Sequence, residues 1–226
     1  MSTVSATNLK HASSASNNIV LDASGNTAIS GAATVGGVAV VTTTGTQTLT
    51  NKTLTSPVIT GASVSSMASS VITSGTSQAS TSGTSIDFTG IPSWVKRITV
   101  MFNGVSTNGT SPLRVQMGSG SIETSGYLGS SSVLATGVAT SQLSGGFDFA
   151  GEATQGSAYT RNGLLIISLL GSNVWTASGS VGLSDRARLF FLGGSKSFSG
   201  VVDRVRITTV NGTDAFDAGS INILYE

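Results

Sequence analysis

The sequence predicts an all-β protein, with an extended amino-terminal trimeric stalk followed by a β-sandwich domain that resembles a jelly roll. The first observation is the distribution of aromatic residues: the 8 Phe, 2 Trp and 3 Tyr residues all lie at or after Phe88. The second is a set of short segments in the later part of the chain in which apolar and polar residues alternate. The third is a series of Asn-Gly pairs, a dipeptide that favours tight turns because both residues tolerate positive φ.

The carboxy-terminal region is predicted to form about eight short strands. In Trp94–Phe102, apolar Ile98 and Val100 alternate with Arg97 and Thr99, which is the period of a half-buried strand. The remaining predicted strands are Leu113–Met117, Phe147–Phe149, Leu164–Leu170, Val174–Ala177, Arg188–Leu192, Val202–Thr209 and Ser220–Tyr225. Hairpin turns are expected at Asn103-Gly104, Asn108-Gly109, Asn162-Gly163 and Asn211-Gly212. Many short strands with turns between them are typical of a sandwich or jelly roll.

Residues 1–80 have a different composition and are predicted to form the stalk. They contain no aromatic residue, and their only charged residues are Lys10, Asp22 and Lys52. Bulky aromatic side chains supply much of the buried area of a core, so one copy of this region lacks the material for one. We therefore expect two regions, an extended stalk region over residues 1–80 and a β-sandwich domain over residues 81–226.

A regular spacing within the stalk region predicts how it is held together. Leu49, Leu54, Ile59 and Val64 recur every five residues, and a Thr or Ser follows each of them. This spacing suits short extended segments that each contribute one apolar side chain to a seam. Because one such residue per turn is too little for a monomer, the seam predicts a homotrimer with apolar residues at the axis. The alternative is a flexible Ser/Thr/Gly linker.

The overall composition excludes several classes of function. The chain carries a net charge of +1 with only 9% charged residues, so it has no basic field to hold a nucleic acid. There is no cysteine for disulfides or thiolate metal sites. The longest apolar stretch, Leu164–Leu170, is too short to span a bilayer, so no membrane insertion is expected. The first residues lack the basic start and apolar run of a signal peptide.

Catalytic and metal-binding patterns point to no enzyme and no cofactor. The single histidine, His11, lies in a Ser/Ala-rich stretch far in sequence from any group of carboxylates. Glu123 could form a hydrolase pair with Asp148 or Glu152, but nothing in their spacing favours this, and solvated loops are the favoured interpretation. The segment Asp214–Asp217 could supply oxygen ligands to Ca²⁺, although a surface turn before the last strand is the favoured interpretation.

Three aromatic residues are candidate receptor contacts. Tyr127, Tyr159 and Trp175 have Ser and Asn residues near them in sequence, and such a combination could stack on a glycan and hydrogen-bond it. The alternative for both tryptophans, Trp94 and Trp175, is a place in the core or in a subunit interface.

Several segments resemble proteins of tailed bacteriophages. The segment TGTQTLTNKTLTSPVITG (Thr44–Gly61) is similar to one that recurs in tail-fibre proteins, and Ala6–Asn26 resembles the amino ends of such fibres. The segments Ile86–Ser111, Ile122–Ser131 and Val202–Glu226 resemble a carboxy-terminal domain widespread in phage and prophage fibres.

This resemblance implies a function and a location. Fibres of this kind are trimers with a virion-anchored amino end and an outward-facing carboxy domain, made in the host cytoplasm and carried on the virion surface. The implied partners are other copies of the chain, a tail protein or the major capsid protein, and a host cell-surface glycan. The chain is short for a complete tail fibre, so a capsid decoration or cement protein that stabilises the phage shell is the alternative.

Overall fold

The computed structural model divides the chain into two compact units, Met1–Ala62 and Ser63–Glu226. It describes five short strands between residues 8 and 39, and residues 72–226 except 152–154 and 158. All the regular structure in these residues is β-strand, and none of them forms a helix that could cross a membrane. The predicted seam residues Leu49, Leu54, Ile59 and Val64, and also His11, lie outside the described residues.

The first unit contains two small antiparallel sheets. One sheet has three strands in the order β1-β2-β3, and the other pairs β4 with β5. The strands are β1 (Asn8–Leu9), β2 (Ile19–Leu21), β3 (Thr27–Ile29), β4 (Thr34–Val35) and β5 (Val38–Ala39).

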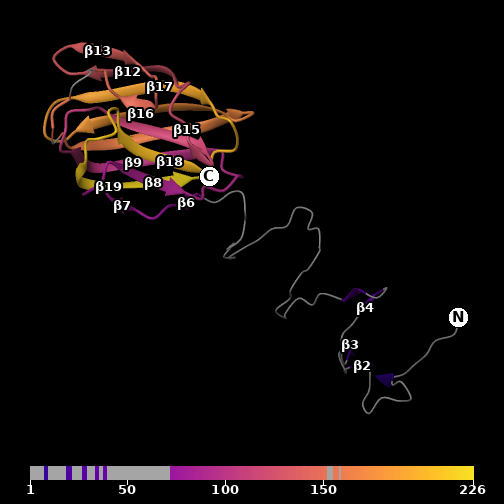
Figure 1. The fold of residues 1–226 in the computed structure, drawn as a ribbon. Helices are drawn as coiled ribbons and strands as arrows, with labels where there is room; N and C mark the ends of the chain where they lie inside the picture. Colours follow the sequence, from indigo (N-terminus) through magenta and orange to yellow (C-terminus); the bar gives the residue numbers. More distant parts are fainter. Residues whose placement is uncertain are drawn as a thin grey trace. The chain divides into compact units, whose positions relative to one another are not determined.

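The second unit consists of two antiparallel sheets (Figure 1). The large sheet has nine strands in the order β13-β12-β17-β16-β15-β9-β19-β6, with β7 also paired to β19. Its strands are β6 (Thr73–Ser74), β7 (Gln78–Ala79), β9 (Arg97–Thr107), β12 (Leu128–Leu134), β13 (Val138–Gln142), β15 (Arg161–Gly171), β16 (Val174–Leu183), β17 (Leu189–Ser197) and β19 (Phe216–Tyr225). The small sheet has five strands in the order β11-β10-β18-β8, with β14 also paired to β10. Its strands are β8 (Ser85–Thr89), β10 (Leu113–Ser119), β11 (Ser121–Ile122), β14 (Phe147–Phe149) and β18 (Arg204–Thr209).

A single hydrophobic core joins the two sheets. Alternate residues of β9 point into this core. Ile98 and Val100 are fully buried, whereas Arg97, which precedes Ile98, is exposed. The ring of Phe102 in the large sheet meets the ring of Phe149 in the small sheet edge to face, with centroids 5.9 Å apart. The alternating pattern of the sequence therefore marks the inner faces of the two sheets, and all eight predicted strands are confirmed.

The pairing of the longer strands is nested. The first long strand β9 pairs with the last strand β19, β10 pairs with β18, β12 pairs with β17, and β15 pairs with β16. Each pair in this series is enclosed by the one before it along the chain. Strands that are far apart in sequence are thus neighbours in space.

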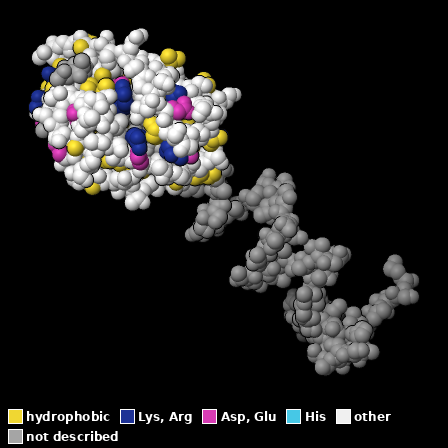
Figure 2. All heavy atoms as spheres, viewed as in Figure 1, with side chains coloured by type: hydrophobic (Ala, Val, Ile, Leu, Met, Phe, Trp, Pro, Cys, Tyr) yellow, Lys and Arg dark blue, Asp and Glu magenta, His cyan; other side chains and the backbone are white. Residues whose placement is uncertain are grey.

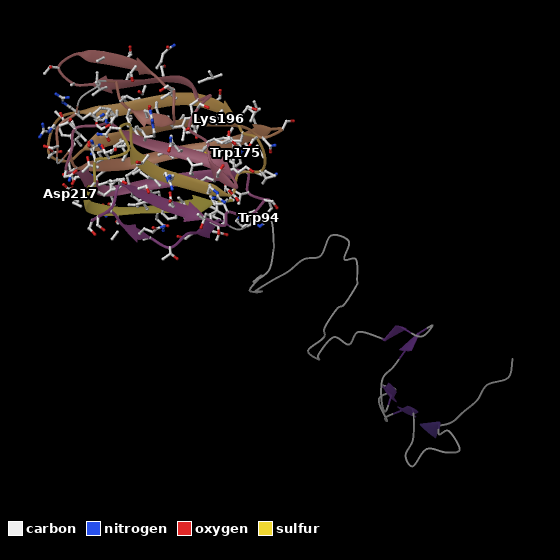
Figure 3. The ribbon with its side chains drawn as sticks, viewed as in Figure 1. Trp94, Trp175, Lys196 and Asp217 are labelled. Carbon is white, nitrogen blue, oxygen red and sulfur yellow. The ribbon has the colours of Figure 1, made fainter. Side chains whose placement is uncertain are left out.

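The register of the strands defines two ends of the second unit. One, here called the proximal end, holds Trp94 and the last residue, Glu226, whose backbone pairs with Arg97. Thr73 also lies there, opposite Tyr225. The other, called the distal end, holds the β9–β10 and β18–β19 loops and the start of β19. Figure 3 shows Trp94 and Asp217 near these two opposite ends.

The expected boundary near residue 80 falls inside the second unit. Short strands β6 and β7 pair with β19 and so extend the large sheet. Ser80 is fully buried, and its hydroxyl donates to the carbonyl of Ala218 at 2.8 Å. The segment lacks aromatic residues, but it contributes backbone hydrogen bonds to a sheet whose core is built by other strands.

None of the four Asn-Gly pairs closes a hairpin, so this prediction is wrong. Asn108-Gly109 and Asn211-Gly212 lie in loops between strands, but the β9–β10 and β18–β19 loops each connect the large sheet with the small one. In contrast, Asn103-Gly104 lies inside β9, and Asn162-Gly163 lies inside β15 next to a shift in register. Positive φ is needed at a bulge as well as at a turn, so the dipeptide does not distinguish the two. Gly104, with φ of 64°, faces a similar irregularity in β19.

Candidate functional site

The outer surface of the large sheet is the most unusual surface of the second unit. We call it the neutral face and define it as the outward-pointing residues of β12, β15, β16 and β17, together with Val138 and Thr140 of β13. Seven of the ten large apolar side chains that are exposed among the described residues belong to it, and no member is charged. The seven are Leu128, Leu134, Val138, Leu164, Ile166, Leu170 and Phe191. Scattered exposed apolar residues are normal, but a concentration on one face marks an interaction surface.

The strand register brings these apolar residues into rows separated by small hydroxyl residues. Leu164 lies opposite Ser180, and Ser180 lies opposite Phe191 on the next strand. At the edge of the face, Leu134 lies directly opposite Val138. Small residues between the apolar ones leave a surface with few long side chains, which suits close contact with another surface.

The size of the neutral face matches that of a protein interface. Its central strands β15, β16 and β17 contain 11, 10 and 9 residues. With strands about 4.8 Å apart and a rise of about 3.3 Å per residue, the five strands present roughly 650 Å² of flat area. A standard interface buries about 800 Å² of accessible surface per partner, and a corrugated sheet exposes more than its flat area.

A groove in the surface of the second unit lies toward the distal end. This groove, called the distal groove, has a volume of about 480 Å³. Three segments line it: the β9–β10 loop with the start of β10, the end of β13 with the segment leading through β14, and the β18–β19 loop. The lining residues are Thr110, Ser111, Pro112, Arg114, Ser141, Gln142, Ser144, Asp148, Ala150, Val210 and Asn211.

A buried ion pair forms one wall of the distal groove. The Nε and Nη2 atoms of Arg114 donate to the two carboxylate oxygens of Asp148 at 2.7 and 2.8 Å. Register fixes the pair, because Arg114 on β10 lies opposite Asp148 on β14. Burial raises the pKa of Asp148 above its ordinary value, and the guanidinium offsets this only in part. The pair is therefore internally neutral and leaves no unpaired charge on this wall.

A second cluster at the distal end surrounds a buried arginine. Arg161 is 1% exposed; it donates to the carbonyl of Tyr159 and to the side-chain oxygen of Gln155, and its Nε has no partner among the described residues. Burial lowers the pKa of Arg161 to about 10. The guanidinium of Arg186 lies 4.4 Å from the ring centroid of Tyr159 and pairs with Asp185. These contacts fasten the loops of the distal end to one another.

The proximal half contains a buried lysine, Lys196, whose contacts hold neighbouring segments together as those around Arg161 do at the distal end. Lys196 pairs with Glu123 at 2.7 Å and lies near the rings of Tyr127 and Phe198, 5.4 and 4.8 Å from their centroids. Burial raises the pKa of Glu123, but hydrogen bonds from Lys196 and Ser199 outweigh it and hold the pKa below its ordinary value.

The three aromatic residues expected to contact a receptor lie inside the protein. Tyr127, Tyr159 and Trp175 are 2, 4 and 3% exposed. The hydroxyl of Tyr127 accepts a hydrogen bond from the backbone of Met117, and Trp175 belongs to the core. A ring whose faces are packed cannot stack on a sugar, so the alternative of a core position applies to Trp175, and Trp94 packs against the core beside Tyr225.

The candidate acidic groups are not brought together in the described residues. Glu123 binds Lys196 and Ser199, whereas Asp148 binds Arg114, and Glu152 lies outside the described residues. Asp214 accepts hydrogen bonds from Ser111 and Asn211 and so closes the β18–β19 loop. Within residues 72–226, as far as they are described, no three acidic or histidine side chains gather as they would around a metal ion.

Charge-free runs are the sequence signal that could have revealed the neutral face. No charged residue occurs between Thr124 and Phe147 or between Asn162 and Ser184, and these runs supply four of its five strands. The distal groove has no comparable signal, because three separate segments build it. Figure 2 shows the same scarcity of charge on the surface in view, where charged side chains form only scattered groups.

Comparison with known proteins adds no relative: no family model, no curated protein and no solved structure matches this chain.

Proposed function

We propose that this chain is a structural protein of a tailed-bacteriophage particle, a homotrimeric fibre whose β-sandwich head contacts the host surface. The sequence segments that resemble phage fibres support this proposal, and they extend over both compact units. The nested pairing of β9 with β19, β10 with β18, β12 with β17 and β15 with β16 supports the jelly-roll-like character of the head. The amino-terminal stalk with its seam of Leu49, Leu54, Ile59 and Val64 remains part of the proposal.

The neutral face is the observation that carries the proposed assembly. Leu164, Ile166 and Phe191 are 40, 38 and 41% exposed in a single copy, and covering them with a neighbouring copy would be favourable. Since no side chain of the face is charged, covering it with another copy takes no charged side chain of this face out of water. In a trimer, each neutral face would lie toward the three-fold axis and meet a different part of its neighbour.

The proposed mechanism is geometric, without a catalytic step. Three heads on one stalk present three equal sites to the host surface, and tethering raises the effective concentration of the second and third sites. The stalk would join the trimer to another virion protein, a tail protein or the major capsid protein.

Electron microscopy of purified virions tests the location. Antibody against the second unit should label the tail and should leave bare the particles of a phage that lacks this gene. Labelling over the whole capsid, with copies numbering in the hundreds, would favour the decoration or cement function instead. Absence of the protein from washed particles would overturn both virion functions.

A further inference from the structure

We infer that the distal groove binds a neutral saccharide; that this saccharide belongs to the host cell surface rests on the proposed function. The groove lies away from the proximal end, where the backbone of Thr73 lies opposite Tyr225 and the described part of the second unit begins. A fibre that is anchored through its amino-terminal region would present such a groove outward.

Charge defines the class of ligand. Among the described residues that line the groove, Arg114 and Asp148 are the only charged ones, and they form the bidentate pair with each other. An anionic ligand such as a phosphate needs a cation that is available to it, and this guanidinium already shares two of its donors with a carboxylate. The lining therefore selects a neutral ligand.

The remaining polar groups suit a ligand with many hydroxyls. The side chains of Thr110, Gln142 and Ser144 are exposed, and none has a hydrogen-bond partner among the described residues. They offer two hydroxyls and an amide, which can both donate and accept, as sugar hydroxyls can. The third donor arm of Arg114, Nη1, makes only a long contact of 3.4 Å with the carbonyl of Val210 and can also serve a ligand.

Apolar groups in the same groove suit the C–H faces of a sugar ring. Pro112, Ala150 and Val210 line it, and Val210 is 38% exposed. The volume of about 480 Å³ falls in the usual range of small-molecule sites, roughly 300–1,000 Å³. Because the lining contains no aromatic platform, binding at one site should be weak, with Kd on the order of 1 mM. Three tethered sites would compensate by avidity.

Saturation-transfer NMR on the full-length chain tests the inference. The probes are the methyl glycosides of glucose, galactose, mannose and N-acetylglucosamine, with glucuronic acid and sialic acid as charged counterparts. We expect transfer to at least one neutral glycoside and none to the charged sugars. Gln142→Trp places a large ring in the groove and should weaken binding at least about tenfold.

A matched variant separates filling of the groove from other effects. Thr213→Trp adds the same ring in the β18–β19 loop, at an exposed position outside the neutral face that does not line the groove, and should keep the binding. Ser144→Tyr is a second filling variant should Gln142→Trp misfold. Binding to charged sugars only, binding to none, or equal binding by the filled and control variants would overturn the inference.

Sedimentation of the same samples keeps the two proposals distinct. A trimer found on virions that binds none of the neutral probes leaves the proposed function intact and removes the saccharide site. A chain that binds a neutral probe but is monomeric and absent from virions retains the site and removes the fibre.

Discussion

Replacing three apolar residues of the neutral face should weaken the association of subunits. The perturbation is the triple variant Leu164→Ser, Ile166→Ser and Phe191→Ser, at side chains about two-fifths exposed in one copy. Fully burying such a side chain contributes about 1.5–3 kcal/mol, so covering the exposed two-fifths contributes about 0.6–1.2 kcal/mol each. Nine such residues in a trimer then contribute about 5–11 kcal/mol to the free energy of association.

Sedimentation of the full-length chain in a series of urea concentrations measures this effect. The triple variant should separate into subunits at a clearly lower urea concentration than the unchanged protein. The fold of the head should persist, because all three side chains point away from the core. The control is the pair Val201→Ser and Val210→Ser, which are 52 and 38% exposed but lie outside the neutral face.

The outcome is decisive even if the stalk also holds the subunits together, since contributions from separate contacts add. A triple variant that separates at the same urea concentration as the unchanged protein would refute the assignment of the neutral face to assembly. Equal weakening by the triple variant and by the valine control would refute it too, because the effect would then belong to exposed apolar surface in general.

Loss of one partner of the buried ion pair should destabilise the head more than loss of both. Arg114→Leu should lower the free energy of unfolding by about 3–5 kcal/mol, and the double variant with Asp148→Leu should lower it distinctly less. Urea unfolding of the single and double variants measures both effects. The acid dependence of unfolding should change in opposite directions at two carboxyls. The pKa of Glu123 is lowered, so its contribution to the free energy of unfolding is present at neutral pH and is lost as the pH falls through its folded pKa. Glu123→Gln should remove this loss of stability in acid. The pKa of Asp148 is raised, so its contribution to the free energy of unfolding is present in acid and is lost as the pH rises through its folded pKa. Asp148→Asn should remove this loss of stability on raising the pH. Urea midpoints measured between about pH 3 and pH 7 would show both effects. Leu54→Asp with Ile59→Asp should separate the stalk while the head stays folded; if native mass spectrometry still finds trimers, the seam is wrong or the head alone dictates assembly.

The strands of the core were predictable because burial of one face leaves a period of two in the sequence. The alternation around Ile98 and Val100 in β9 is of this kind. Strand β12 was not predicted, since four of its seven residues are Ser or Gly. There the inward position Ser131 is filled by a polar side chain, whose hydroxyl lies 3.2 Å from that of Ser141. Hydrophobic periodicity cannot reveal a buried position that is polar.

Turn chemistry was predictable only in part. The tight turn between β15 and β16 uses Ser172 and Asn173, with φ of 48° and 62°, and not an Asn-Gly pair. Conversely, Gly104 serves a close approach of two strands: a Cβ on Gly219 would come within 2.4 Å of the Gly104 carbonyl oxygen. Local sequence indicates which backbone conformations are available, whereas the long-range pairing determines whether a turn or a bulge uses them.

The functional surfaces were hardest to predict, for a physical reason. The sequence suggested aromatic residues as ligand contacts. A core assembled between two sheets needs bulky side chains, however, and Tyr127, Tyr159 and Trp175 are buried in the head. The distal groove depends on small polar residues such as Ser111 and Ser144, which are common throughout this sequence. Only the fold brings them together.

Ion pairs within the head connect the low net charge of the chain with the proposed assembly. Of the 11 Lys and Arg residues in the chain, at least six form ion pairs among the described residues of the second unit. These pairs are Arg97–Glu226, Arg114–Asp148, Arg186–Asp185, Lys196–Glu123, Arg204–Asp203 and Arg206–Asp87. Charges neutralised within one copy add little repulsion between copies, and proteins near zero net charge associate readily. A lone head would leave its neutral face open to unspecific aggregation, whereas the homotrimer that we propose would cover it.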